Sequence, residues 1–331
     1  MCELKIYSEC LQKIGPKKYA ELKKRNYCVS YFKRRLTSEI RNFWLCRTSL
    51  EYSERWWRDV EAEGKSINYI SEYPGDDSTP FSSISISPSD YIAAKDDVLW
   101  SLRGNAITNI VTAFETYLYG GTKRAIFLNP AIMENSGIEF SAGDIGKSFD
   151  EHDPRIWFSE EIVKKYIRNK SHGEMIKKID ALIKGGIWKG QADLIARWVR
   201  KVTLRNALIH NAKLVNEELI NAWPNKFLSI GSPIQLEDGD VIKSHFVAYE
   251  LATLMDQQFI RTTVCDEDAK LLARVAYLCD REQTIGQIAD IVSKVLNHPI
   301  GKKNVESAIA YQKRTRERIP DFTAIQELVI N

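Results

Sequence analysis

Apolar residues recur every three or four positions through most of this chain, a spacing that is typical of amphipathic helices. The clearest run starts with a cap at Ser89 or Asp90 and is predicted to end at Gly120-Gly121. Its buried face would comprise Leu99, Leu102, Ala106, Ile110, Ala113, Phe114 and Tyr117. Similar periodicity predicts helices over residues 17–63, 159–184, 191–211 and 241–260. We therefore expect an all-α fold built around an antiparallel helical bundle.

Two stretches interrupt this periodicity. Residues 72–89 are rich in Pro, Gly, Ser and Asp, which favours a loop and marks the first domain boundary. Residues 122–158 contain Asn-Pro, Ser-Gly and Asp-Pro steps, so they are predicted to be an irregular insertion with at most short elements. A third stretch, residues 226–240, is predicted to form a short hairpin or an extended turn.

The tail contains three more helical runs, over residues 266–279, 284–296 and 302–318. The last of them is basic, and three short helices with a basic third resemble a helix-turn-helix or winged-helix unit. A small packing or dimerisation domain would give the same pattern. These breaks divide the chain into a basic helical region with its linker, the central bundle and a small helical domain, over residues 1–88, 89–264 and 265–331.

Composition limits the classes of protein to which the chain can belong. Its 331 residues allow two or three cores, and no run of eighteen apolar residues appears, so we expect no membrane span. The first ten residues carry acidic side chains and lack an apolar stretch, which predicts no secretory signal and a cytoplasmic location. The six cysteines are widely spaced, so reduced thiols are expected, with neither a metal site nor a cofactor.

Charge is distributed unevenly along the chain. The net charge is +3, but residues 1–60 hold fourteen Lys and Arg against seven Asp and Glu. This excess predicts a polyanion partner, RNA, near the amino-terminal part. Basic side chains alternate there with aromatic ones, and the candidate RNA-binding residues are Lys23, Lys24, Arg25, Lys33, Arg34 and Arg35. The alternative is a helical hairpin whose aromatics form a core and whose lysines form a solvated face.

The stretch Leu204–Leu219 carries the candidate chemistry, because it places Arg205, Asn206 and His210 at the end of an amphipathic run. These groups can hold a phosphodiester and move protons without a metal. Positions five apart on a helix differ by about 140°, so Arg205 and His210 cannot both face one phosphate from a single straight helix. Two copies related by a twofold axis would bring two such sets into one cleft, which predicts a homodimer. Singly, each residue could also be an ordinary surface or helix-terminating residue.

These residues resemble the motif of the HEPN superfamily, which includes many RNA-cleaving toxins and anti-phage proteins. The motif is Arg205-Asn206-x-x-x-His210 followed by Asn211. Two other segments are similar, AFETYL at Ala113–Leu118 and the Gly-x-x-Ile-x-Leu turn at Gly231–Leu236. The resemblance covers about residues 90–262 and leaves both flanking parts unassigned.

The resemblance implies a metal-independent endoribonuclease in which the ribose 2'-hydroxyl attacks the adjacent phosphorus. The product would carry a 2',3'-cyclic phosphate. His210 would act as base or acid, Arg205 would neutralise the phosphate, Asn206 would orient the backbone or the imidazole, and Glu115 would steer Arg205 or share in proton transfer. A toxin or defence effector of this kind can have an antitoxin or a defence-complex partner.

Two other classes of function fit the same sequence. One is a noncatalytic RNA-binding or regulatory bundle whose tail binds DNA, and the other is an adaptor in a defence complex. Cleavage of RNA would distinguish the expected endoribonuclease from both of these noncatalytic alternatives.

Overall fold

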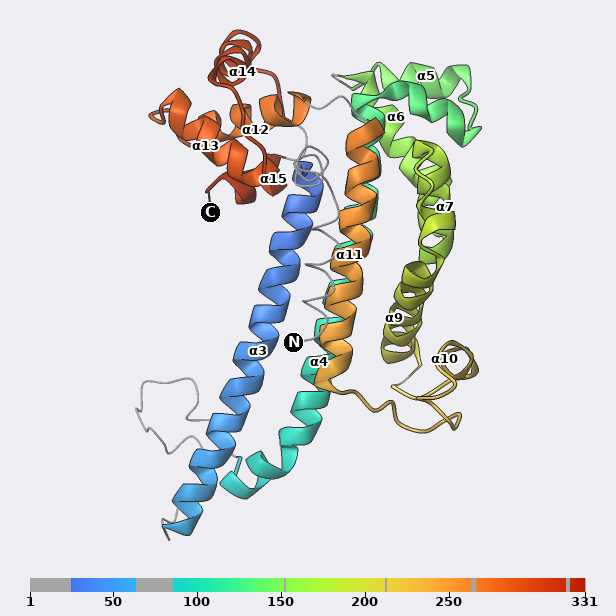
Figure 1. Ribbon diagram of the computed structural model, residues 1–331, viewed down its shortest axis with the longest axis vertical. Helices are drawn as coiled ribbons and strands as arrows, with labels where there is room; N and C mark the ends of the chain where they lie inside the picture. Colours follow the sequence, from blue (N-terminus) through green and yellow to red (C-terminus); the bar gives the residue numbers. More distant parts are fainter. Residues whose placement is uncertain are drawn as a thin grey trace, which may run out of the picture. The chain divides into compact units, whose positions relative to one another are not determined.

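The computed structural model describes residues 25–63, 86–151, 153–211, 213–262, 266–319 and 322–330. Regular structure in these ranges is helical, apart from one isolated bridge between Leu214 and Pro233, so the all-α prediction is confirmed (Figure 1). The elements are α3 (Tyr27–Ala62), α4 (Pro88–Leu128), the 3-10 helix η3 (Pro130–Ser136), α5 (Ala142–Ser148), α6 (Pro154–Ile162), the π-helix η4 (Val163–Ile167), α7 (His172–Ile183), α8 (Ile187–Gly190), α9 (Ala192–His210), α10 (Glu217–Ala222), α11 (Asp238–Thr262), α12 (Asp266–Cys279), α13 (Ile285–Leu296), α14 (Lys302–Thr315) and α15 (Phe322–Ile330). Across the described ranges, no helix is long and apolar enough to cross a membrane.

The chain divides into two compact units. Unit 1 comprises residues 1–35, 113–197 and 249–331, and unit 2 comprises residues 36–112 and 198–248. The boundaries between them fall inside α3, α4, α9 and α11, so each of these helices contributes to both units. Unit 1 draws on all three of the domains expected from the sequence, and that three-part division stays a prediction.

Unit 2 is built on α3 and α4, which run antiparallel. Asn109 donates to Glu39 at 3.0 Å near one end of this pair, and Lys95 binds Glu54 further along it. The helices bury Leu36, Phe43, Leu99, Ile107 and Ile110. The parts of α9 and α11 in this unit add a second set of buried side chains, including Trp198, Leu204, Val241 and Val247. The amphipathic periodicity of the sequence therefore closes a core in this unit.

An aromatic core in unit 1 joins α3, α4 and α11. Phe32 packs against Phe114 and Tyr117 with ring centroids 5.8 and 5.3 Å apart, and the Tyr117 ring also meets Phe259 at 6.3 Å. The Tyr117 hydroxyl donates to the carbonyl of Ala252 at 3.0 Å, so its polar end is satisfied inside the core.

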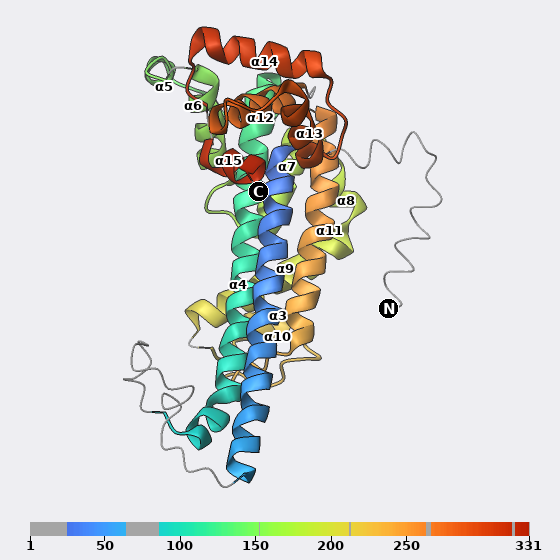
Figure 2. The ribbon, with the colours of Figure 1, turned by 90° about the vertical axis from the view of Figure 1, so that its left-hand side faces the viewer.

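The four C-terminal helices of unit 1, α12 to α15, pack on one another, and α14 lies against α12 (Figures 1 and 2). Two hydrogen bonds attach them to the chain at the beginning of α3. Arg25 donates its backbone N–H to Leu296 at 2.9 Å, and the Ser30 hydroxyl donates to the carbonyl of Val295 at 2.5 Å. A buried ion pair of 2.5 Å joins Arg124 of α4 to Asp268 of α12. This group therefore packs on the same core as α3 and α4.

The predicted end of the bundle helix at Gly120-Gly121 is wrong, because α4 continues through both glycines to Leu128. A Cβ at Gly121 would lie 2.9 Å from Cε2 of Phe259, which is closer than real contacts allow. Gly121 therefore serves close packing of α4 against α11, not a left-handed helix terminus. Of the predicted irregular insertion, residues 122–128 are helical, and the described part of the remainder holds the short elements η3 and α5 and the start of α6.

The predicted single helix over residues 159–184 is also wrong, because it divides into α6 with η4 and then α7. Asn169 takes a left-handed φ of 65°, and Ser171 and Glu174 form a capping box that starts α7. The helix α15 was not expected from the sequence, whereas α9, α11, α12, α13 and α14 lie where periodicity placed them.

The start of α4 differs slightly from expectation. The helix begins at Pro88, and the hydroxyl of Ser87 accepts a hydrogen bond of 3.1 Å from the backbone of Asp90. Ser87 is therefore the cap, and neither Ser89 nor Asp90 takes that role. Most of the loop predicted over residues 72–89, and residues 1–24, lie outside the described residues.

Candidate active site

The candidate motif lies on the last turns of α9, in unit 2. Leu204 and Ala207 face the core and are buried, so they fix the rotation of the helix about its axis. Arg205 and Asn206 are half-buried, and His210 is exposed as the last residue of α9. The helix thus carries its polar groups from a half-buried position out to solvent over a little more than one turn.

A tight turn follows α9. The Asn211 side-chain amide donates to the carbonyl of Leu214 at 2.9 Å, and the backbone N–H of Leu214 donates to the carbonyl of Asn211 at 2.9 Å. Lys213 takes a left-handed φ of 67°. Asn211 therefore organises the chain after His210, with one of its side-chain N–H groups bound inside the turn.

The segment after this turn pairs with a second loop of unit 2. Val215 donates to Ser232 at 2.9 Å, Gly231 donates to Val215 at 2.8 Å, and Ile234 donates to Lys213 at 3.0 Å. Gly231 has a φ of 81°, a conformation that a side chain would strain. The predicted turn over residues 231–236 therefore lies beside the end of α9.

Helix α4 holds this second loop in place. The Trp100 indole donates to the carbonyl of Ile234 at 2.6 Å, and Arg103 donates to the carbonyl of Leu236 at 3.1 Å. The side chain of Leu236 packs where α4 has Gly104, since a Cβ added to this glycine would lie 3.8 Å from Leu236 Cδ1. The loop beside His210 is thus anchored through its backbone to a long helix of the same unit.

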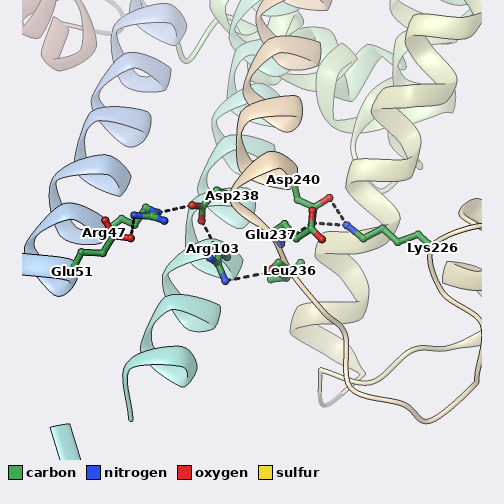
Figure 3. Close-up of polar contacts among 8 residues, drawn as sticks. All are labelled: Arg47, Glu51, Arg103, Lys226, Leu236, Glu237, Asp238 and Asp240. Atoms are coloured by element: carbon green, nitrogen blue, oxygen red, sulfur yellow. Dashed lines mark hydrogen bonds and ion pairs between the residues drawn. The ribbon is translucent and has the colours of Figure 1, made fainter. Parts of the chain in front are cut away.

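An ion-pair network fixes the start of α11 (Figure 3). Asp238 accepts from Arg47 of α3 at 2.5 Å and from Arg103 of α4 at 2.8 Å, and Arg47 also binds Glu51 at 2.5 Å. Burial alone would raise the pKa of Asp238, but the hydrogen bonds from the two guanidinium groups outweigh it and lower the pKa. The carboxylate therefore stays charged and ties three helices together.

A second carboxylate of α11 holds the chain that follows α10 (Figure 3). Both oxygens of Asp240 lie 2.5 Å from the Lys226 ammonium, and one of them accepts from the backbone of Glu237 at 3.0 Å. These contacts set the two ends of the loop over residues 226–240, so the loop that borders the motif is fixed at its base.

Lys201 is buried on α9 one turn before Arg205, and its ammonium lies 4.5 Å from the centroid of the Trp223 ring. Burial lowers its pKa to about 8, although the nearby Asp240 acts in the opposite direction. This site was not expected from the sequence, since nothing in the local pattern separates a buried lysine from an exposed one.

Glu115, the expected acidic partner of Arg205, belongs to unit 1, whereas Arg205 belongs to unit 2. Within unit 1, the Tyr119 hydroxyl donates to Glu115 at 3.1 Å, and Nε2 of the buried His172 lies 3.8 Å from the other carboxylate oxygen. Burial and the adjacent carboxylate raise the pKa of Tyr119 to about 12. No sequence pattern links His172 to Glu115, whereas the four-residue spacing of Glu115 and Tyr119 places both on one helix face.

The candidate RNA-binding residues occupy different environments. Lys23 and Lys24 lie outside the described residues, Arg25 and Arg35 are half-buried, and Arg34 is exposed and donates to the carbonyl of Glu327. Lys33 is buried 4.2 Å from the centroid of the Tyr249 ring, and burial lowers its pKa to about 8. Lys33 is therefore not placed to contact an RNA backbone, because its ammonium is enclosed in unit 1.

Several apolar side chains are exposed around the end of α9. Ile209 precedes His210, Leu214 lies in the following turn, and Leu228 and Ile230 lie in the paired loop with 80% and 68% of their surface exposed. Such a cluster is typical of a surface that another protein covers. Sequence periodicity did not reveal it, because the side chains come from three separate segments.

No group of three or more metal-ligating side chains occurs among the residues that the structure describes. Comparison with family models, with curated proteins and with solved structures gives no match to this chain. Function is therefore inferred from the residues themselves and from their arrangement in the fold.

Proposed function

We propose that this chain is a metal-independent endoribonuclease with a HEPN-like bundle, acting as a toxin or an anti-phage effector. The observation that carries the proposal is the placement of Arg205, Asn206 and His210 at the solvent-facing end of α9, beside a loop that is fixed to α4. An antitoxin or a defence-complex partner is part of the same proposal, and the helix-turn-helix character of α12 to α14 stays a prediction.

The proposed reaction is a transesterification within the RNA strand. The ribose 2'-oxygen bonds to the adjacent phosphorus and gives its proton to a base, and the bond from phosphorus to the 5'-oxygen breaks. The leaving oxygen takes a proton from an acid, so the products are a 2',3'-cyclic phosphate and a 5'-hydroxyl. The imidazole of His210 serves as base or acid near neutral pH, and the Arg205 guanidinium neutralises the nonbridging oxygens.

Two copies of the chain complete this site. Arg205 and His210 are five residues apart on a continuous helix, so their side chains diverge by about 140°. A second copy related by a twofold axis supplies the missing group from the opposite direction. The exposed side chains of Ile209, Leu214, Leu228 and Ile230 provide apolar surface for such a contact next to His210.

Variants of α9 test the proposal. We expect His210→Ala to slow single-turnover RNA cleavage by roughly 10²- to 10⁴-fold, and Arg205→Ala by roughly 10²- to 10³-fold, with folding and RNA affinity unchanged. The matched control is Arg200→Ala, which removes an exposed guanidinium from the same helix in unit 2 and should leave the rate unchanged.

The chemistry of the cut ends gives an independent criterion. Ends that carry a cyclic phosphate support attack by the 2'-hydroxyl, whereas ends that carry a 3'-hydroxyl contradict it. Expression of the wild type should arrest growth and expression of His210→Ala should not. RNA binding without cleavage under any condition would replace the nuclease by the noncatalytic alternative.

A further inference from the structure

Unit 1 contains a cleft that the proposed reaction does not use. It has a volume of about 1970 Å³ and lies between the last turns of α4, the segment with α6, and the helices α12 and α14. A drug-sized ligand needs only roughly 300–1,000 Å³. The cleft therefore suits a segment of a polymer better than a single small molecule.

The charges that line the cleft leave an excess of cations. Nine Lys and Arg side chains line it, against six Asp and Glu. Four of these acids already bind lining cations in the pairs Lys123–Glu160, Arg155–Asp153, Lys270–Glu267 and Arg274–Glu317, at 2.7, 2.6, 2.7 and 3.1 Å. Two exposed acids remain, Asp150 and Glu151. Five lining cations lie outside these four pairs, so they outnumber the two remaining acids.

Four lining cations remain accessible to a ligand. All four are exposed, and none of them makes an ion pair within the described ranges: Arg281, Lys313, Arg316 and Arg318. They come from the loop after α12, the last turn of α14 and the segment that follows it. A group of cations that line one cleft is suited to a chain of phosphates.

Aromatic rings lie among these cations. Tyr311 is 40% exposed, and the guanidinium groups of Arg274 and Arg314 lie 5.1 and 5.8 Å from its ring centroid. Tyr277 is half-buried, and the Lys313 ammonium lies 5.2 Å from the centroid of its ring. Exposed rings beside cations are the usual means by which proteins hold unpaired bases, because every base has a face on which to stack.

We infer that this cleft binds a single-stranded segment of RNA. The phosphates contact Arg281, Lys313, Arg316 and Arg318, and the bases stack on Tyr311 and Tyr277. The choice of RNA over single-stranded DNA rests on the proposed nuclease function, whereas the choice of a single strand over a duplex rests on the cleft. Reading of a duplex needs a protruding helix that enters a groove, but Lys313 and Tyr311 of α14 line a concavity.

Charge reversal inside and outside the cleft tests this inference. The protein is the full chain with His210→Ala, so that RNA stays intact, and the probe is a fluorescent oligouridylate of about 15 nucleotides in an anisotropy titration. We expect Lys313→Glu with Arg318→Glu to weaken binding on the order of tenfold or more. The slope of log Kd against log salt should fall by about 1.4, since each contact to a single strand contributes about 0.7.

Helix α14 supplies the matched control. Lys302→Glu with Lys303→Glu makes the same charge change on the same helix, but both lysines are exposed at its other end and do not line the cleft. That double variant should change Kd by less than about twofold. Tyr311→Ala should weaken binding by roughly five- to a hundredfold through lost stacking, and Tyr311→Phe should not, because it retains the ring.

The outcomes separate this inference from the proposed nuclease. Equal weakening of RNA binding by both charge-reversed double variants would contradict the inference that the cleft binds single-stranded RNA. Binding of duplex DNA or of oligodeoxyuridylate that is tighter than binding of the oligouridylate would contradict it as well. If the wild type cleaves RNA and the cleft variants bind like their control, the cleft fails and the nuclease stands. If the wild type cleaves nothing and the variants lose RNA binding as expected, the nuclease fails and the cleft stands.

Discussion

The end of α9 in unit 2 and the cleft of unit 1 differ in the kind of side chain that each offers. At the end of α9, one imidazole, one guanidinium and one carboxamide lie among exposed apolar side chains such as Leu228 and Ile230. In the cleft, cations lie beside aromatic rings such as that of Tyr311. The first set can move protons and the second can hold a strand.

Under our two proposals, chemistry and affinity belong to different sites of the chain. A site with few cations binds a polyanion weakly by itself, whereas a row of cations binds it without selecting a bond to break. The two sites use different side chains, so a variant in one site can be measured while the other serves as reference.

Mixed subunits should give the largest effect. Arg205→Ala and His210→Ala chains are each inactive in our proposal, but a dimer of one with the other retains one guanidinium and one imidazole in the shared cleft. Random exchange makes about half of the dimers mixed, so we expect cleavage to return to as much as about half of the wild-type rate. The measurement is single-turnover cleavage after co-refolding, and a mixture as inactive as its parents would contradict a shared site.

The buried ion pair of unit 1 should give the largest change in stability. Asp268→Ala leaves the Arg124 guanidinium enclosed, with only 8% of its side chain exposed, and should lower the free energy of unfolding by roughly 3–5 kcal/mol. Glu160→Ala breaks the Lys123–Glu160 pair, which also starts from α4 but has its carboxylate 56% exposed, and should cost less than about 1 kcal/mol. Urea unfolding would measure both, and equal losses would show that the Asp268 pair is not buried in solution.

Lys201 in unit 2 predicts a dependence on pH. Its folded pKa of about 8 lies below the value near 10.4 of an unfolded lysine, so burial of the charged form costs stability below pH 8. Lys201→Met should therefore raise the free energy of unfolding by roughly 2 kcal/mol at pH 7, and this gain should disappear as the pH rises from about 8 toward 10.4. The test is to measure the free energy of unfolding at pH 7 and at about pH 10.4, with the exposed Lys189→Met as control. A gain in stability that persists at the higher pH would exclude titration of Lys201 as its cause.

Two glycines of α4 should respond in opposite directions. A Cβ at Gly121 in unit 1 meets Phe259 at 2.9 Å, so Gly121→Ala should destabilise the protein by roughly 1–3 kcal/mol. A Cβ at Gly104 in unit 2 meets only Leu236 and Leu208, at 3.8 and 3.9 Å, so Gly104→Ala should stabilise it by roughly 0.5–1 kcal/mol. Thermal unfolding of both variants measures these changes. A Gly121→Ala variant as stable as the wild type would refute the packing role of Gly121, and a destabilised Gly104→Ala variant would refute the open space at Gly104.

Periodicity predicted the long helices because a buried face must recur with the helical repeat, as in α9 and α11. The motif on α9 could be read for a related reason, since its three residues are close in the sequence. Ser171 and Glu174 form a capping box that marks the start of α7 in the sequence. The continuous apolar pattern around them nevertheless predicted a single helix. A glycine that permits close packing and a glycine that ends a helix look the same in a sequence, so the end of α4 could not be placed from Gly121.

Contacts between distant segments could not be predicted. Asp238 binds Arg103 and Arg47, which lie 135 and 191 positions away along the chain, and nothing local marks any of the three as partners. The cleft cations likewise appeared only as a basic stretch, because the rings and acids beside them come from other helices. The amino-terminal basic residues show the converse, since Lys33 looked like a surface cation and is enclosed.

In the proposed dimeric nuclease, the exposed apolar side chains of Ile209, Leu214, Leu228 and Ile230 would make activity depend on the concentration of the chain. When two molecules must meet before either can act, output at low dose grows with the square of the amount present. A cell that keeps the concentration of the chain low would therefore keep its activity low. A rapid increase in synthesis, or the loss of a partner that covers these apolar side chains, would activate the proposed dimer.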